Sequence, residues 1–223
     1  MSGYTVRIRT LSATLLGSGE GQGSTIDRDI VFDSHGLPFF PARRFKGLMR
    51  ESCLEVQDML YKSHSMLSEH MPRVDSVFGV PGQQETSCLR WGDLHLAGEP
   101  NLVAWLDWLS GNETLHPLVE PQAVVEALTE SRAQTRIGPD GVAAPGSLRT
   151  SRLLRAGIAL SGSIDVVQAI PGTATLLALA ALNLRRVGTG RNRGLGAVQV
   201  RLFSDDGADI TEPALDSLKG ETL

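Results

Sequence analysis

Residues 185–203 read RRVGTGRNRGLGAVQVRLF, and they separate two apolar runs of different period. The preceding run, residues 173–184, is typical of a buried helix, whereas residues 197–203 alternate like a strand. The stretch has no acidic residue, and four arginines, at residues 185, 186, 191 and 193, lie among its four glycines, which are Gly188, Gly190, Gly194 and Gly196. A glycine-rich turn lets backbone N–H groups approach an anion closely, and arginine side chains add bidentate phosphate contacts. The stretch therefore predicts a loop that holds a phosphate backbone.

The direction of this loop excludes a nucleotide cofactor. Dinucleotide-binding and Walker loops run from a strand into a helix, whereas residues 185–203 run from a helix into a strand. No Gly-Lys-Ser/Thr sequence follows the glycines. Four arginines without an acidic neighbour favour phosphate contact over a simple tight turn.

The basic residues are clustered, although the formal net charge of the chain is −4. That net charge excludes a protein that coats nucleic acid with its entire surface. Thirteen of the 21 Lys and Arg residues fall within residues 43–50, 132–155 and 185–193, where Asp140 is the only acid. Acidic residues gather instead in residues 204–223. We therefore expect one basic face and an acidic remainder.

Length and composition predict a single domain spanning residues 1–223, because 41% hydrophobic residues suffice for a buried core. The two cysteines do not form a CxxC pair, which argues against a structural zinc site and fits a reducing cytoplasm. The start of the chain lacks a signal-peptide pattern, and the most apolar run is too short to span a bilayer. We therefore expect a cytoplasmic protein without a membrane partner.

Hydrophobic periodicity predicts an α+β fold. Residues 4–16 begin as a half-buried strand, residues 17–24 read as a glycine-rich loop, and Pro41 opens a helix with an apolar stripe. The later core elements are a strand in residues 88–97, a strand in residues 153–167, a helix at residues 173–184 and a strand at residues 195–203. The order strand, helix, strand, strand, helix, strand is that of a ferredoxin-like (RRM-like) βαββαβ core.

The remaining segments are insertions and a tail around this core. The core itself occupies about residues 4–62, 88–97 and 153–203. Residues 98–152 are insertions that begin with helices at residues 101–110 and 117–130. Residues 132–150 have no apolar period, so they predict a long exposed loop or hairpin, and such segments are usually functional or disordered. Residues 204–223 form an acidic C-terminal tail that we expect to be peripheral.

The helix opened by Pro41 carries cations in its first turns, where they oppose the helix dipole by a few tenths of a kcal/mol each. These cations are Arg43, Arg44 and Lys46. Taken alone, these three cations could belong to an ordinary solvated helix face. Taken together with the other two basic clusters, they favour a helix N-terminus that binds an anion. Lys46 and Arg50 share one face at i, i+4, so not all of these residues can contact one phosphate.

Three segments together carry a resemblance to a known family. They are GSTIDRDIVFDSHGLPFFPARRFKGLMRE at residues 23–51, the arginine-rich segment at residues 132–155 and GTGRNRGLGAV at residues 188–198. In this order they resemble the RAMP superfamily, the RNA-binding proteins of CRISPR systems. The likeness is greatest to the small backbone subunit of type III effector complexes, in which residues 132–155 would form a thumb-like hairpin.

The resemblance implies RNA as the ligand. Copies of such a subunit line up along a guide CRISPR RNA, together with other subunits of the complex, and the guide pairs with target RNA. The thumb wedges between bases, and the only sizeable apolar candidates for that role here are Ile137, Val142 and Leu148. The residues expected to bind RNA are Arg43, Arg44, Lys46, Arg50, Arg132, Arg136, Arg186, Gly188, Gly190, Arg191, Asn192 and Arg193.

The resemblance also implies endoribonuclease cleavage of the bound target RNA, with an aspartate that depends on Mg²⁺ or another divalent cation. Asp27 matches that aspartate, but Asp29 and Asp33 lie close by, and the proline that usually follows the aspartate is absent. Aspartates in such loops also form turns and caps without any catalytic role. The alternatives are a purely structural guide-binding subunit and a metal-independent guide-processing endoribonuclease that uses His35 as a general base.

Overall fold

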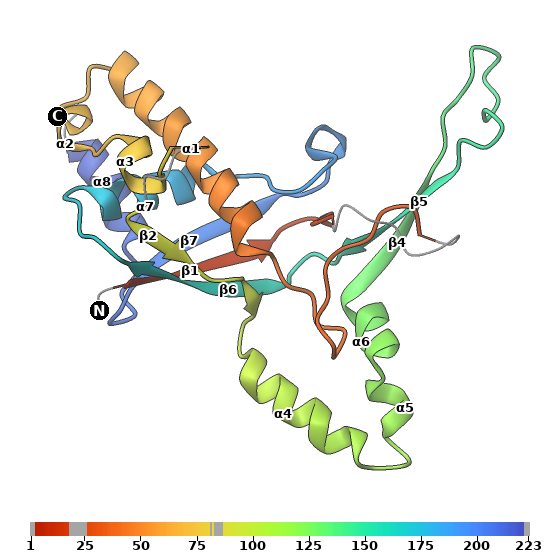
Figure 1. The fold of residues 1–223 in the computed structure, drawn as a ribbon. Helices are drawn as coiled ribbons and strands as arrows, with labels where there is room; N and C mark the ends of the chain where they lie inside the picture. The colour runs from red at the N-terminus through yellow and green to blue at the C-terminus, as the bar shows by residue number, and fades with distance from the viewer. Residues whose placement is uncertain (1–2, 18–25, 81, 83–86, 221–223) are drawn as a thin grey trace.

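The computed structural model describes residues 3–17, 26–80, 82 and 87–220, and almost all of the predicted loop at residues 17–24 lies outside them. The described chain is built on one antiparallel sheet with its main helices on one face (Figure 1). The strands, from one edge to the other, are β2 (Leu89–Trp91), β6 (Ala159–Val166), β1 (Gly3–Thr10) and β7 (Val198–Ser204), and β3 (His95–Leu96) also pairs with β6.

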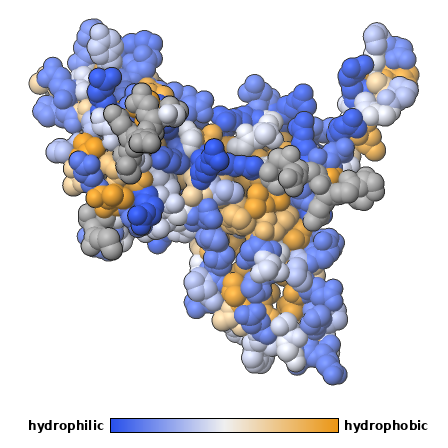
Figure 2. Space-filling view, viewed as in Figure 1, coloured by the Kyte–Doolittle hydropathy of each residue, from blue (hydrophilic) through white to orange (hydrophobic). Residues whose placement is uncertain are grey.

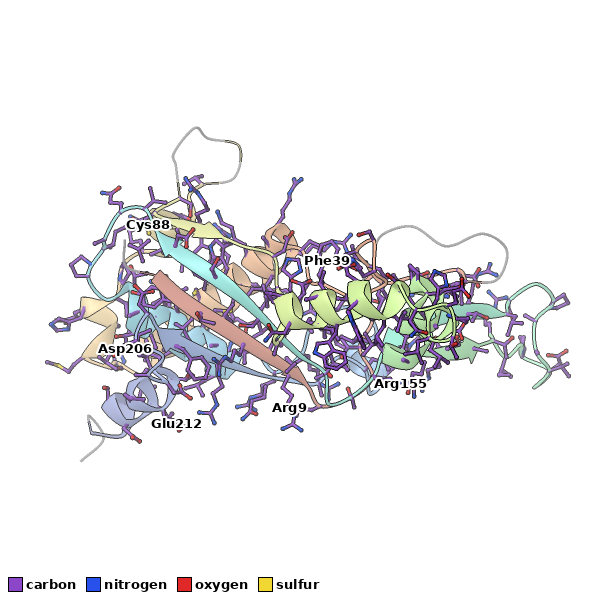
Figure 3. All side chains as sticks on the ribbon, turned by 90° about the horizontal axis from the view of Figure 1, so that it is seen from below. Arg9, Phe39, Cys88, Arg155, Asp206 and Glu212 are labelled. Carbon is purple, nitrogen blue, oxygen red and sulfur yellow. The ribbon has the colours of Figure 1, made fainter. Side chains whose placement is uncertain are left out.

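This strand order confirms the ferredoxin-like prediction. The first strand, β1, lies between β6 and β7 and is antiparallel to both. Helix α1 (Ala42–Lys62) connects β1 to β2, and helix α7 (Thr173–Asn183) connects β6 to β7. The two helices pack on each other over one face of the sheet. In Figure 3, which views the molecule from below, β1 and β6 lie in front of these helices.

Periodic burial explains why these segments form their elements. Along β1, Val6 and Ile8 are buried while Arg7 and Arg9 are exposed, as the alternation of a strand requires. Helix α1 buries most of its apolar stripe, including Phe45, Met49 and Leu60, although Met59 is 51% exposed. Helix α7 buries seven of its eleven residues because it lies between α1 and α8 (Thr211–Gly220).

Two predicted strands are each divided in the structure. The segment at residues 153–167 contains the end of β5 (Arg149–Leu154) and all of β6, separated by a turn in which Gly157 has φ +88°. The Thr10 hydroxyl holds this turn, because it donates to Arg155 O at 2.8 Å and accepts from Ile158 N at 3.0 Å. Residues 88–97 likewise divide into β2 and β3.

The insertion contains three helices and a hairpin. The helices are α4 (Glu99–Ser110), α5 (His116–Val119) and α6 (Pro121–Leu128). Strand β4 (Thr129–Gln134) then pairs with β5, and their connection extends away from the sheet (Figure 1). The hairpin prediction is therefore confirmed. The helices share a small separate core in which Leu37, Leu106 and Val124 are buried.

The acidic C-terminal segment is not a peripheral tail. Helix α8 packs against α7, where Ala214 is buried. Thr211 at its start is fully buried, and its hydroxyl accepts a hydrogen bond from Leu202 N at 2.9 Å. Two shorter helices, α2 (Leu67–His70) and α3 (Val74–Phe78), follow α1. Within the described residues, no helix is both long enough and apolar enough to cross a membrane.

Candidate nucleic-acid interface

The glycines of the loop between α7 and β7 hold it against the segment that follows β1. Gly188 has φ +76°, and a Cβ atom there would lie 2.2 Å from Leu15 O. A Cβ atom on Gly196 would lie 2.0 Å from Val187 O. Thr189 N donates to Leu15 O at 3.2 Å. Close backbone approach therefore requires Gly188 and Gly196, whereas the sequence pattern alone predicts glycines that approach a phosphate.

The arginines are at the exposed end of this loop. A short 3₁₀ turn, η1 (Arg191–Arg193), carries exposed Arg191, Asn192 and Arg193. Arg191 Nε donates to Gly188 O at 3.1 Å, and the Arg186 guanidinium donates to Arg191 O. The loop is therefore braced by its own side chains and presents cationic groups to solvent.

Three depressions of the described surface meet at Arg191. The first, of about 650 Å³, lies between α1, the aspartate-containing loop and the glycine loop. The second, of about 580 Å³, lies between the glycine loop and the base of the hairpin. Both are lined by Leu15, Arg28 and Thr189 as well as Arg191. The third, of about 290 Å³, runs from Arg191 along α1. Because all three share Arg191, we name them together the arginine track.

The first depression is lined by apolar side chains and by charged side chains, of which three are arginines. Its apolar lining consists of Leu15, Leu16, Phe40 and Leu48, and its charged lining consists of Arg28, Arg44 and Arg191 together with Asp27 and Asp29. In Figure 2, apolar surface is exposed in the middle of this view of the molecule, between hydrophilic regions.

Gly47 of α1 also lines this depression, and a Cβ atom there would have nothing within 4 Å among the described residues. Glycine inside a helix costs about 1 kcal/mol relative to alanine.

The basic cluster of α1 is divided between two sides of the helix. Arg44 lines the arginine track, whereas Arg50 Nη2 lies 2.7 Å from Asp75 Oδ1 of α3. Burial lowers the pKa of the Lys46 ammonium, against an opposing electrostatic effect of Cys88. Lys46 and Arg50 thus face α3 and the start of β2 rather than the track. Arg43 is exposed, and it lines none of the three depressions.

The hairpin contributes its base to the track. Arg132 and Gln134 of β4 line the second depression together with the glycine loop. Arg136 lies farther out on the hairpin and is exposed. The apolar residues proposed to wedge between bases are 60–62% exposed, namely Ile137, Val142 and Leu148. The far end of the hairpin therefore presents apolar side chains without covering them.

Asp27 is held at the base of the hairpin with its carboxylate exposed. Its N–H donates to Thr150 O at 2.9 Å, and Thr150 N donates to Asp27 Oδ2 at 2.8 Å. Arg149 Nε lies 3.8 Å from Asp27 Oδ1, and the Asp27 side chain is 42% exposed. Asp27 also lines the first depression. The structure therefore brings this aspartate to the arginine track.

Asp29 and Asp33 have structural partners instead. Arg152 Nη1 lies 2.9 Å from Asp29 Oδ2, and both side chains are buried. Asp33 Oδ1 accepts from the backbone N–H groups of His35 and Leu37, which closes the turn between them. Asp33 therefore stabilises a turn, and Asp29 neutralises a buried arginine.

His35 points toward the insertion. Its Nε2 lies 3.1 Å from Asp107 Oδ1 of α4, and its Nδ1 lies 3.9 Å from Asp33 Oδ2. It does not appear among the residues that line the three depressions. The candidate general base is thus held against α4, away from the surface that carries the arginines.

The described residues contain no group of three or more His, Cys, Asp or Glu side chains that could hold a metal ion. A divalent cation at Asp27 would have one protein carboxylate. Mg²⁺ often binds in this way, because it keeps several waters and uses substrate phosphates as further ligands. The residues present therefore fit a cation that binds only together with RNA.

Sequence reasoning missed Arg28 and the apolar lining of the track. Arg28 lies between two aspartates, outside the three basic clusters of the sequence. Its bridge to Ser151 of β5 turns it toward both large depressions. Leu15 and Leu16 looked like the end of a strand, and only the fold places them beside Phe40 and Leu48. No local pattern signals such a lining.

Comparison with known proteins agrees with the ferredoxin-like fold. The sequence matches the model of the RAMP superfamily over residues 7–199, and the chain therefore belongs to this superfamily. No curated protein matches it in sequence.

Two similar solved structures confirm the fold. One is described as the type III-B Cmr-beta complex bound to cognate target RNA; the matched chain is 14% identical with a TM-score of 0.62, and the match covers 90% of this chain and 96% of that one. The other is described as the apo state of type III-B Cmr-beta; the matched chain is 15% identical with a TM-score of 0.61 and the same coverage.

Proposed function

We propose that this protein is an RNA-binding backbone subunit of a type III CRISPR effector complex, in which several copies line a guide CRISPR RNA. The observation that carries the proposal is the arginine track, because α1, the aspartate-containing loop, the glycine loop and the hairpin meet there. Membership of the RAMP superfamily supports it. The two similar structures, both of type III-B Cmr-beta and one of them bound to cognate target RNA, support it as well.

The track suits the backbone of a single strand. Arg44, Arg28, Arg191 and Arg132 come from four separate elements and line connected depressions, so they can contact successive phosphates. Such contacts position RNA but carry no sequence information. Recognition of a target sequence would then depend on base pairing with the guide.

We further propose that Asp27 takes part in cleavage of the target RNA. Its carboxylate is exposed on the track, whereas Asp29 is buried in an ion pair and Asp33 closes a turn. A bound divalent cation would supply Lewis-acid polarisation of a phosphate oxygen and lower the pKa of an attacking 2′-hydroxyl. Arg28 and Arg149, which flank Asp27, would hold the phosphates of the strand beside it.

The test uses the assembled complex with matched target RNA, with and without EDTA. Asp27→Asn keeps the size of the side chain and its acceptor for Thr150 N, so it removes the charge with little change in packing. We expect cleavage by the wild-type complex to be lost in EDTA and in Asp27→Asn, and to be retained in the matched control Asp33→Asn.

Two outcomes would favour the alternatives. Binding of guide and target RNA without cleavage by the wild-type complex in any divalent cation would indicate a purely structural subunit. Cleavage that persists in EDTA but disappears in His35→Ala would indicate the metal-independent mechanism. Failure of the protein to bind guide RNA would overturn the proposed function itself.

A further inference from the structure

One face of the sheet places arginines close together on neighbouring strands. Val6 and Ile8 of β1 are buried in the main core, to which α1 and α7 also contribute. The residues that alternate with them, Arg7 and Arg9, therefore point to the other face of the sheet, and both are exposed. Arg7 lies directly opposite Arg201 of β7 in the antiparallel register, and like charges in this position destabilise a sheet. We name Arg7, Arg9 and Arg201 the cationic sheet face.

The surroundings of these arginines favour a protein partner over a nucleic acid. Arg201 Nη1 lies 3.1 Å from Asp209 Oδ2 and also pairs with Glu212. These carboxylates would repel a phosphate. The Arg7 guanidinium lies 4.4 Å from the centre of the Phe203 ring, so this ring already packs against a cation, whereas sheets that bind RNA stack bases on their aromatic rings. A partner that brings both carboxylates and aromatic surface suits this face.

The insertion of the same chain has the complementary composition. Residues 99–128, which contain α4, α5 and α6, include five acidic residues and no lysine or arginine. In α4, Leu106 is buried, whereas Trp105 and Trp108 are 61% and 68% exposed, with their ring centroids 5.8 Å apart. Helices α4 and α5 extend away from the sheet (Figure 1). We name Trp105 and Trp108 the tryptophan surface.

We infer that the cationic sheet face of one copy of this protein binds the tryptophan surface of the next copy. Guanidinium groups pack on the faces of tryptophan rings, and the acidic side chains of the insertion neutralise the sheet arginines. Tryptophan and arginine are also the residues that contribute most to binding at protein interfaces. The two surfaces differ, so the contact is heterologous and can continue from copy to copy. This inference rests on the proposed function, in which several copies line a guide RNA, and names the surfaces that join them.

Two variants and two matched controls test the contact. Arg9→Glu reverses a charge on the cationic sheet face, and the control Arg73→Glu makes the same change at an exposed residue just before α3. Trp105→Ala together with Trp108→Ala removes the tryptophan surface, and the control Tyr61→Ala removes an aromatic side chain of α1 that is 76% exposed. All the replaced side chains are exposed, so we expect every variant to fold, and thermal unfolding checks this.

Two single-stranded RNAs separate RNA binding from the contact between copies. One is so short that it holds a single copy of the full-length protein, and the other holds several copies, which sedimentation velocity counts. We expect the wild type and both controls to fill the long RNA cooperatively. Arg9→Glu should bind the short RNA as Arg73→Glu does, and the double tryptophan variant as Tyr61→Ala does. On the long RNA, the association between copies should weaken on the order of thirtyfold in both test variants.

Mixing the two test variants shows whether the two surfaces meet each other. Arg9→Glu keeps an intact tryptophan surface, and the double tryptophan variant keeps an intact cationic sheet face. In an equal mixture, one copy of each should therefore associate on the long RNA as tightly as two wild-type copies. These pairs should not extend further, because both outer surfaces are the altered ones.

Four results would overturn the contact while leaving the proposed function in place. The first is a wild type that fills the long RNA without cooperativity. The second is wild-type cooperativity in either test variant, and the third is a mixture that forms no pairs. The fourth is weaker binding of the short RNA by Arg9→Glu than by Arg73→Glu, which would mean that RNA itself binds the cationic sheet face. Absence of wild-type binding to the short RNA would instead refute the proposed function.

Discussion

The guanidinium of Arg152 lies 2.9 Å from the carboxylate of Asp29, and both side chains are buried. Arg152 belongs to β5 at the base of the hairpin, and Asp29 belongs to the loop that also carries Asp27. The Arg152 guanidinium also lies 5.8 Å from the centre of the Phe32 ring. This pair therefore joins the hairpin to the aspartate-containing loop and holds Asp27 at the arginine track.

Breaking the pair from one side should destabilise the protein strongly. Asp29→Ala leaves a buried guanidinium without its carboxylate, and removal of one partner from a buried pair costs about 3–5 kcal/mol. Urea unfolding of the wild type and of the variant measures the difference. The double variant Asp29→Leu with Arg152→Met should lose less than Asp29→Ala, because no charge stays buried. A double variant that is less stable than Asp29→Ala would contradict this account.

The glycines of the loop before β7 should differ in their tolerance of alanine. Gly194 and Gly196 have nearly the same positive φ, so alanine costs about 1–2 kcal/mol of backbone strain at either position. A Cβ atom on Gly194 meets nothing within 4 Å, whereas one on Gly196 would lie 2.0 Å from Val187 O. We expect Gly196→Ala to be clearly less stable than Gly194→Ala in urea unfolding. Equal stabilities would show that the backbone shifts freely there.

The two sides of α1 should respond differently in RNA binding. If one subunit contacts about four phosphates, the log–log salt slope for single-stranded RNA is about −3. Arg191→Ala or Arg44→Ala removes a cation from the track, so each should weaken binding and reduce the slope by about 0.7. Arg50→Ala should leave both unchanged, because Arg50 pairs with Asp75. A salt slope near zero for the wild type would refute phosphate contact by the track.

The attachment of α8 should weaken in acid. Burial raises the pKa of Asp209, but hydrogen bonds from Thr211 and the nearby Arg201 outweigh it and lower that pKa below its usual value. A carboxyl group whose pKa is lower in the folded than in the unfolded state stabilises the protein fully at pH values above its unfolded-state pKa, which is about 3.9. That stabilisation is lost as the pH falls through the folded-state pKa. Asp209→Asn should therefore lower the free energy of unfolding at pH 7 and have little effect near pH 2. Urea titrations at both pH values measure this, and an equal effect at the two would contradict it.

Element order and the basic clusters were predictable because they depend on local sequence. Alternation such as that around Val6 and Ile8, and apolar runs such as the one before Arg185, are read from short segments, and six such segments together predict the βαββαβ order. The break at Gly157 was not predictable, because the Thr10 hydroxyl that stabilises it belongs to a strand far away in the chain. The packing of α8 on α7 was not predictable either. The few apolar residues of α8 lie among acidic residues, so the segment reads as a solvated tail.

The sequence by itself determined that this protein has a ferredoxin-like core, a cationic glycine loop and a basic hairpin. Only the tertiary structure decided which charges face the track. Arg44 and Arg50 both belong to the basic start of α1, yet they lie on opposite sides of its buried stripe. Because of the way the helix packs on the sheet, Arg44 lines the track and Arg50 contacts Asp75. Asp27 and Asp29 are two residues apart, and pairing with Arg152, 123 positions later, buries one and leaves the other exposed.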